Sequence, residues 1–380
     1  MKKVWFASAM LSAALLAACG EEETTTTTTP SEGGEIETTA EEKIIQDQLG
    51  RDVTINGTER IVTSGVLPYH SAWYFSTGSS KEIVGMHPNS YSATENSVLA
   101  SISPDMLNAS TAFVQNGEMN IEELMKINPD IFFEIATDTA TIEQAEKVGI
   151  PTVAVKTFNQ AGAEPLATFK SWLDLNEDIT GLSERKNAFL EEGTAAQDMI
   201  DERLVDVAET DKPKILFLYA VSDSKLTVTG SNFFGEQWIK ATGGIDVAGE
   251  AGIQGRKDVN IEQIYDWNPD VIYITNFTSA QPDDLYNNTI GSFDWSDIAA
   301  VQNDRVHKVP LGIYRWYAPS GDAPLMLKWL AQNNYPALFN DYSMEEELKV
   351  YYSKLYDYDL SPDEVQSILH PVSEAAKVTK

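Results

Sequence analysis

The sequence is poor in the residues that usually carry redox, metal and catalytic chemistry. Cys19 is the only cysteine in 380 residues, which leaves no thiol in the body of the chain for a disulfide, a nucleophile or an iron–sulfur cluster. No G-x-S-x-G, H-E-x-x-H or P-loop motif occurs. These absences argue against an enzyme, although a secreted hydrolase with a dispersed site stays open. The few histidines lack the mutual spacing of metal ligands: His70, His87, His307 and His370.

Positive charge is also scarce. Lys and Arg number 27 against 58 Asp and Glu, and the formal net charge is −31. Because such a chain repels polyanions, the charge argues against nucleic acid as a partner. Any arginines and lysines that converge in one cleft would stand out against this background.

The first residues have the pattern of an export signal. Two lysines precede an apolar run that is too short to favour a transmembrane helix. The motif LAAC, which ends at Cys19, resembles the bacterial lipobox and implies a lipid anchor on that cysteine. The pattern therefore predicts a signal peptide at residues 1–18. Residues 19–49, acidic and rich in threonine, are predicted to be a disordered tether.

One segment of the chain occurs twice. NIEELMKINPDIFF at residues 120–133 returns as NIEQIYDWNPDVIY at residues 260–273, with no gap. In each copy Asn can cap a helix, with Glu123 or Gln263 completing a capping box. The Asn-Pro pair then ends the helix, and apolar residues follow as a short buried strand. Each copy is predicted to be a helix that feeds a strand.

Further strands are predicted around both copies. They are expected at residues 60–62, 151–155, 214–218 and 306–309. Strands that alternate with helices indicate mainly parallel sheets covered on both faces. Apolar residues recur at about helical spacing from residue 183 to residue 208, which predicts one long helix between the two sets of strands.

The sequence therefore predicts an α/β fold of two similar lobes with mainly parallel sheets, joined by one long α-helix. The predicted boundaries are an N-terminal lobe at residues 50–180, a linking helix at 181–210, and a C-terminal lobe with a helical tail at 211–370. In open α/β sheets ligands bind beyond the carboxyl ends of the strands. A ligand cleft is therefore expected between the lobes.

At this level the chain resembles the periplasmic or lipid-anchored binding proteins of iron–siderophore, haem and cobalamin ABC importers. The resemblance covers about residues 50–370 and implies two lobes bridged by a long helix, no enzymatic activity, no cofactor, and a permease as partner. The resemblance rests on both copies of the repeat and on three further segments: Gly50-Arg51-Asp52-Val53, Gly149-Ile150-Pro151-Thr152-Val153 and Gly312-Ile313-Tyr314-Arg315-Trp316.

Aromatic and basic residues gather in the segments that follow the predicted strands. Aromatic rings pack against large organic ligands, and arginine binds carboxylate or catecholate oxygens with a fork of donors. The group favours an anionic metal chelate, with Arg256 and Lys257 placed in a loop and His70 as a secondary candidate for binding the metal directly. The predicted ligand-binding residues are Tyr69, His70, Trp73, Tyr219, Asn232, Phe233, Arg256, Lys257, Tyr314, Arg315 and Trp316.

We therefore expect a lipid-anchored substrate-binding protein on the outer side of a membrane of the cell envelope, with a ferric siderophore favoured over cobalamin or haem as its small-molecule ligand. A surface adhesin and a binder of bare metal ions remain as alternatives. Members of the family dock onto their permease through one acidic residue in each lobe. Glu143 and Asp283 stand at equivalent distances from the two copies of the repeat and are the docking candidates.

Overall fold

The computed structural model describes residues 42–158 and 164–376. The predicted signal peptide, Cys19 and most of the predicted tether lie outside these residues. No helix in the described ranges is both long enough and apolar enough to cross a bilayer. The prediction that the tether extends to residue 49 is wrong, because β1 (Lys43–Gln46) already pairs with β2 (Asp52–Ile55) in an antiparallel hairpin.

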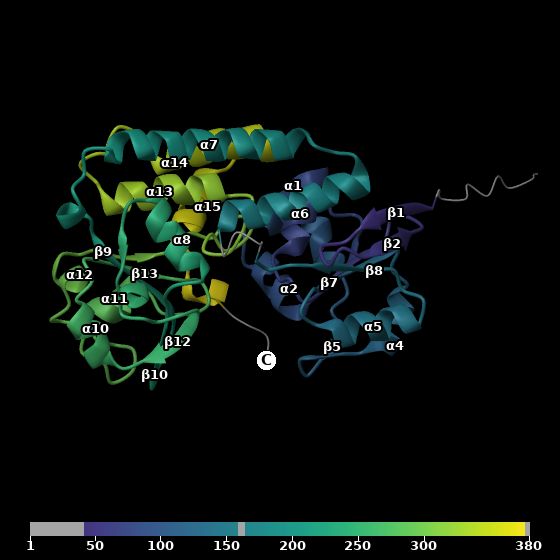
Figure 1. The fold of residues 1–380 in the computed structure, drawn as a ribbon, viewed down its shortest axis with the longest axis horizontal. Coiled ribbons are helices and arrows are strands. Elements are labelled where there is room, and N and C mark those ends of the chain that lie inside the picture. Colours follow the sequence, from purple (N-terminus) through teal and green to yellow (C-terminus); the bar gives the residue numbers. More distant parts are fainter. Residues whose placement is uncertain (1–41, 159–163, 377–380) are drawn as a thin grey trace, which may run out of the picture. The chain divides into compact units, whose positions relative to one another are not determined.

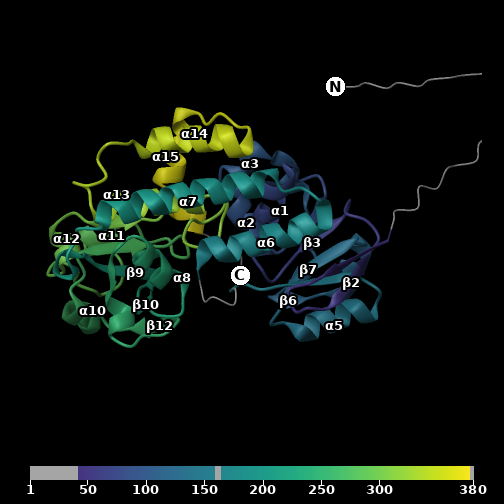
Figure 2. The same cartoon turned by 45° about the horizontal axis from the view of Figure 1, so that its top comes forward.

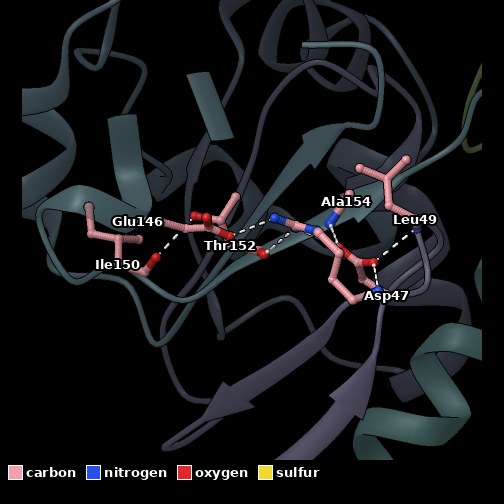
Figure 3. A network of polar contacts seen from close by, with 7 residues as sticks. Asp47, Leu49, Glu146, Ile150, Thr152 and Ala154 are labelled. Atoms are coloured by element: carbon pink, nitrogen blue, oxygen red, sulfur yellow. Dashed lines mark hydrogen bonds and ion pairs between the residues drawn. The ribbon is translucent and has the colours of Figure 1, made fainter. Parts of the chain in front are cut away.

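Asp47 fixes this hairpin to the first lobe (Figure 3). Its buried carboxylate accepts hydrogen bonds from the backbone N–H groups of Leu49 at 2.9 Å and Ala154 at 3.2 Å. Arg51 forms ion pairs of 2.6 Å with both Asp47 and Glu146. A buried carboxylate needs such donors, so this short polar segment is ordered by the lobe it touches.

The first lobe is built on a parallel sheet with the strand order β4-β3-β7-β8. Its strands are β3 (Ile61–Thr63), β4 (Ile83–Met86), β7 (Ile131–Ile135) and β8 (Thr152–Val155), and a small hairpin adds β5 (Val114–Gln115) and β6 (Glu118–Met119). Its helical elements are α1 (Tyr69–Thr77), α2 (Pro88–Glu95), α3 (Leu99–Ile102), η1 (Pro104–Asn108), α4 (Ile121–Ile127), α5 (Thr139–Lys147) and α6 (Pro165–Thr180).

The second lobe repeats this parallel core and adds an antiparallel edge. Its sheet has the order β12-β10-β9-β13-β14, with β11 also paired to β9. Its strands are β9 (Lys214–Ser222), β10 (Lys225–Thr229), β11 (Ile245–Asp246), β12 (Arg256–Val259), β13 (Val271–Ile274) and β14 (Val306–Lys308). Its helical elements up to β14 are η2 (Glu209–Asp211), α8 (Phe234–Ala241), α9 (Val247–Glu250), α10 (Ile261–Trp267), α11 (Pro282–Tyr286) and α12 (Ala299–Gln302).

Each copy of the repeat forms a helix that feeds a central strand, as predicted. Asn128 and Asn268 end α4 and α10 in the left-handed conformation, with φ of 50° and 41°. The capping box is complete only at Asn260, where Gln263 returns the bond. The predicted box at Asn120 is half formed, because the Asn120 N–H donates to a backbone oxygen instead.

The long helix α7 (Glu184–Leu204) contacts α1 and α6 of the first lobe and α13 and α14 of the second. Figure 1 shows α7 above the second-lobe strands β9 and β13, with its other end near α1 and α6 of the first lobe. A Cβ on Gly193 would approach Leu166 of α6 to 2.7 Å. The glycine, which weakens a helix by itself, therefore allows α7 to pack closely against α6.

Helices follow the last strand, as predicted for the tail. They are α13 (Ala323–Asn334), α14 (Met344–Tyr356), α15 (Pro362–Leu369) and the short η3 (Ser373–Ala376). α14 packs against both α13 and α7 (Figure 2). One hydrophobic cluster contains residues of both sheets, α7 and this tail, so the aromatic residues of the tail serve mainly in packing.

Candidate functional site

The predicted loop after the first strand is a helix, and its three candidate residues are buried. Tyr69, His70 and Trp73 belong to α1, with exposed fractions of 0%, 0% and 1%. The Tyr69 hydroxyl donates to Asn176 Oδ1 at 2.7 Å, and its ring packs on Phe133. These side chains form the core of the first lobe and do not line the cleft.

His70 has no ring nitrogen left for a metal. Its Nδ1 lies 2.9 Å from the Leu67 carbonyl oxygen and its Nε2 lies 2.8 Å from Thr94 Oγ1. Burial lowers the pKa of His70 to about 4. This neutral, doubly hydrogen-bonded ring does not fit the secondary role of direct metal ligand. Among the residues that the structure describes, no group of three His, Cys, Asp or Glu side chains is arranged to hold a metal ion.

A cavity of about 290 Å³ lies between the lobes, lined by segments from both sheets. Most of these segments follow the carboxyl ends of strands, where ligands are expected in α/β folds. The first lobe contributes Gly65, Leu67, Pro68, Ile135, Thr157, Phe158 and Trp172, and the second contributes Tyr219, Phe233, Phe234, Arg256, Phe277, Tyr314, Ala318 and Pro319.

Aromatic rings make the walls of this cleft. Tyr219 stacks on Phe277 with centroids 4.8 Å apart and planes at 14°. Phe158 of the first lobe stacks on Phe234 of the second at 5.0 Å and also contacts Phe233. These rings line the cavity, and an aromatic lining suits a planar organic ligand.

Arg256 lies at the edge of the cleft, on a strand and not in the predicted loop. It opens β12, where its guanidinium carbon lies 5.0 Å from the centre of the Tyr219 ring, and its Nη1 donates to the Tyr219 hydroxyl at 3.0 Å. Lys257 is the next residue of the same strand and does not line the cavity. The difference follows from strand geometry, since successive side chains point to opposite faces.

Arg315 is the most unusual residue of the site. Its side chain is 1% exposed, and its guanidinium carbon lies 4.7 Å from the centre of the Phe277 ring and 5.7 Å from that of Tyr314. Arg315 Nε and Nη2 have no hydrogen-bond partner. In the described ranges no carboxylate forms an ion pair with it. Burying a cation without a counter-charge costs free energy. We therefore expect the site to bind an anion.

A second buried cation lies at the end of β14 in the second-lobe sheet. Lys308, the last residue of β14, donates to the carbonyl oxygens of Thr275, Thr278 and Ala280 at 3.0, 2.7 and 2.8 Å. Burial, and next the charge of Arg315, lower the pKa of Lys308 to about 7. Lys308 thereby holds the segment that carries Phe277.

The other predicted residues are placed less directly. Asn232 adopts φ of 60° and does not line the cavity, and its N–H donates to Glu236 at 2.8 Å. Trp316 is fully buried behind the cleft, where its Nε1 donates to Asp322. Tyr219, Phe233, Arg256 and Tyr314 line the cavity, and Arg315 lies against the rings of Phe277 and Tyr314, which also line it. The remaining six candidates lie outside the cavity.

Three aromatic residues of the cleft were missed from the sequence: Phe158, Trp172 and Phe277. A signal was present for Phe158 and Phe277, since each follows a correctly predicted strand by a few residues. The carboxyl-end rule, applied to every strand, would have found both. Trp172 comes from α6, for which the sequence offered no comparable signal.

A second cavity, of about 510 Å³, shares Gly65 and Ile135 with the cleft, and the charged residues that line it are acidic. Glu118, Glu134 and Asp138 line it, and no Lys or Arg does. Glu134 is buried and accepts from the N–H groups of Gly65 at 2.9 Å and Ile135 at 2.7 Å. Burial raises the pKa of Glu134 to about 7.

The docking candidates lie on exposed helices beyond the two central strands. Glu143 is on α5 and contacts Lys147 at 3.8 Å, with 66% of its side chain exposed. Asp283 is in the first turn of α11 and is exposed.

Fold and cleft together define a two-lobed ligand-binding protein with a helical bridge. Residues 77–310 match the periplasmic binding protein family. The chain therefore belongs to that family. It is a substrate-binding protein of an ABC importer, acts outside the cytoplasm, and is a transport component, not an enzyme.

Solved and characterised relatives cover most of the chain. The periplasmic solute binding protein of Veillonella parvula is 32% identical with a TM-score of 0.77, covering 87% of this chain and 97% of that one. The molybdate-binding protein MolA of Haemophilus influenzae is 24% identical over 340 residues, 85% of this chain and 93% of MolA. Its molybdate-bound structure aligns with a TM-score of 0.70. Nickel-bound CeuE of Helicobacter pylori is 21% identical, with a TM-score of 0.64 over 86% and 99% of the two chains.

Proposed function

We propose that the cleft binds an anionic metal chelate of the ferric siderophore type and delivers it to the permease. The observation that carries this proposal is the buried guanidinium of Arg315, whose Nε and Nη2 lack partners. A carboxylate or catecholate oxygen of the ligand would supply the missing acceptors through charge-assisted hydrogen bonds. Arg256 adds a second positive charge at the cleft entrance.

The aromatic walls favour an organic ligand over a bare ion. Tyr219, Phe277 and the Phe158–Phe234 pair offer flat faces, which pack well against planar chelating groups. The volume of about 290 Å³ lies at the lower end of small-molecule pockets. A compact chelate, or one arm and the metal centre of a larger one, fits this space better than haem or cobalamin.

A small oxyanion is the second candidate. The same small cavity and unpaired guanidinium suit a tetrahedral anion, and the relative MolA binds molybdate. The aromatic lining is what separates the two candidates, because an inorganic oxyanion gains little from ring faces. We therefore rank the chelate first.

A titration of the purified soluble domain tests the proposal. Trp172 lines the cavity, so its fluorescence reports occupancy. We expect saturable quenching by an anionic ferric siderophore and weaker or no response to molybdate, haem, cobalamin or free metal ions. Saturation by molybdate alone would favour the oxyanion, and the absence of any response would favour the adhesin alternative.

We also propose that the protein is anchored through a lipid on Cys19 and docks through Glu143 and Asp283. The sequence around Cys19 and the exposure of both acids, on equivalent helices of the two lobes, support this. Reversing both acids to lysine should abolish uptake by whole cells and leave ligand affinity unchanged. A loss of ligand affinity, or full uptake, would contradict the docking role.

A further inference from the structure

A fully buried carboxylate lies directly behind the loop that carries Arg315. Asp322 precedes α13 and has no exposed surface. Its Oδ2 accepts from the Ile313 N–H at 3.0 Å, from Trp316 Nε1 at 2.9 Å and from the Tyr352 hydroxyl at 2.9 Å. Its Oδ1 accepts from the Tyr356 hydroxyl at 2.7 Å. Two of these donors flank Arg315 in the chain.

The loop passes so close to this carboxylate that only glycine fits at one position. A Cβ on Gly312 would lie 1.8 Å from Asp322 Oδ2 and 2.6 Å from Trp316 Nε1. Leu311 and Arg315 also pair across the turn in an isolated antiparallel bridge. The backbone around Arg315 is therefore tightly fixed from behind.

The Arg315 side chain, in contrast, is not fixed by an acid. Its Nε and Nη2 have no partner, and no ion pair joins it to Asp322. The acceptor positions of Asp322 are taken by the two tyrosines, the indole and the backbone N–H. The direction of the guanidinium therefore depends on the loop backbone and on the rings beside it.

We propose that Asp322 is a positioning residue for ligand binding, which holds the loop so that Nε and Nη2 of Arg315, beside the cavity-lining rings of Phe277 and Tyr314, stay available to the ligand. The proposal rests on the proposed role of Arg315 in binding an anion. Asp322 accepts hydrogen bonds from four donors near the loop and forms no ion pair with Arg315. A preorganised charge loses less free energy on binding than one that must first be ordered.

The same carboxylate connects the loop to the rest of the molecule. Tyr352 and Tyr356 stand one turn apart on α14, and the Tyr356 ring contacts Phe75 of α1 in the first lobe at 5.5 Å. The neighbouring Tyr351 is equally buried, yet its hydroxyl donates to the Gly321 carbonyl oxygen and not to Asp322. Tyr351 therefore provides a matched control.

A double-mutant cycle tests whether the network acts through Arg315. The affinity for an anionic ferric catecholate is measured for Tyr352→Phe, Tyr351→Phe and Arg315→Met, and for Tyr352→Phe combined with Arg315→Met. We expect Tyr352→Phe to weaken binding by about fivefold in the natural protein and by less than twofold in the Arg315→Met background. Tyr351→Phe should leave affinity unchanged. An equal loss in both backgrounds, or a similar loss in the control, would overturn the proposal.

A second measurement needs no ligand. In protein with isotope-labelled arginine, the Arg315 Nε–H resonance is assigned by its loss in Arg315→Met, and the Phe277 ring should shift it strongly. We expect this shift to shrink in Tyr352→Phe and to persist in Tyr351→Phe. An unchanged resonance in Tyr352→Phe would overturn the positioning role. Failure of the natural protein to bind any chelate would instead contradict the proposed function.

Discussion

In the first lobe the strand that ends the repeated segment, β7, carries a buried acid, Glu134, near its carboxyl end. In the second lobe β14 and the loop after it carry two buried cations, Lys308 and Arg315. The scaffold beneath is nearly the same: β3 pairs with β7, and β9 pairs with β13, in parallel and in matching register. The repeated segments therefore set the framework, and the segments outside the repeat set the charge of each edge.

Replacing the cation of the second lobe should have the largest effect. Arg315→Met is expected to weaken binding of an anionic chelate by about 100-fold or more, because a charged hydrogen-bonding partner of the ligand is lost. The same change should raise the thermal midpoint of the free protein, since it removes a buried charge without a counter-ion. Calorimetric titration and thermal unfolding measure the two effects. A parallel fall in affinity and midpoint would indicate simple misfolding.

The opposite charges should give opposite dependences of stability on pH. Burial raises the pKa of Glu134 to about 7, so its stabilising contribution is complete below its unfolded pKa and is lost as pH rises towards 7. Burial and the charge of Arg315 lower the pKa of Lys308 to about 7, so its contribution is complete at alkaline pH and is lost as pH falls to 7.

Two variants separate these contributions. The unfolding free energy of the natural protein should fall between pH 4.5 and 7.5, and in Glu134→Gln this fall should be smaller by about 2–3 kcal/mol. Lys308→Met should flatten the rise between pH 7 and 9. Denaturant unfolding at several pH values checks both, and each variant is the control for the other. Slopes that do not change would show that these groups do not titrate as their burial indicates.

Substitutions within the repeat should affect both lobes alike. Asn128 and Asn268 end their helices in the left-handed conformation, which costs a residue such as alanine about 1–2 kcal/mol. Asn128→Ala and Asn268→Ala should each lower the unfolding free energy by about that amount and leave ligand affinity unchanged. A loss of affinity in either variant would mean that the repeat takes part in binding.

The smallest effect is expected at the entrance of the cleft. Arg256→Met should weaken binding by about threefold to fivefold, because the exposed guanidinium interacts with the ligand through solvent. Lys257→Met removes the same charge from the next residue of β12, on the opposite face, and should have no effect. Equal losses in both variants would show that general charge, not contact, attracts the ligand.

Much of the framework was predictable from local pattern. The two copies of the repeat revealed two parallel sheets because Asn-Pro stops a helix wherever it occurs and the apolar run after it has to be buried. The hairpin at β1 and β2 was missed from the sequence, since its attachment to the lobe depends on the contact of Asp47 with Ala154, which is distant in the chain. The strand β12 was also missed, because charged residues on an exposed edge lack the usual apolar alternation.

The cleft was only partly predictable, for a related reason. Arg315 stood out because a cation between aromatic residues is hard to explain by packing alone. Tyr69, His70 and Trp73 were placed in the cleft by the carboxyl-end rule, but the chain turns directly into α1 and buries them. Residue type and position along the chain show which segments approach a cleft, whereas the direction of each side chain depends on packing across the whole lobe.

The most direct measurement compares two ferric chelates of similar size and opposite charge. Calorimetric titration of the soluble domain with an anionic ferric catecholate and with a cationic ferric hydroxamate isolates the role of the buried cations. Saturable binding of the anionic complex, at least tenfold tighter than that of the cationic one, is the expected result. Tighter binding of the cationic complex would contradict the account, because an unpaired Arg315 would then face a ligand of its own charge.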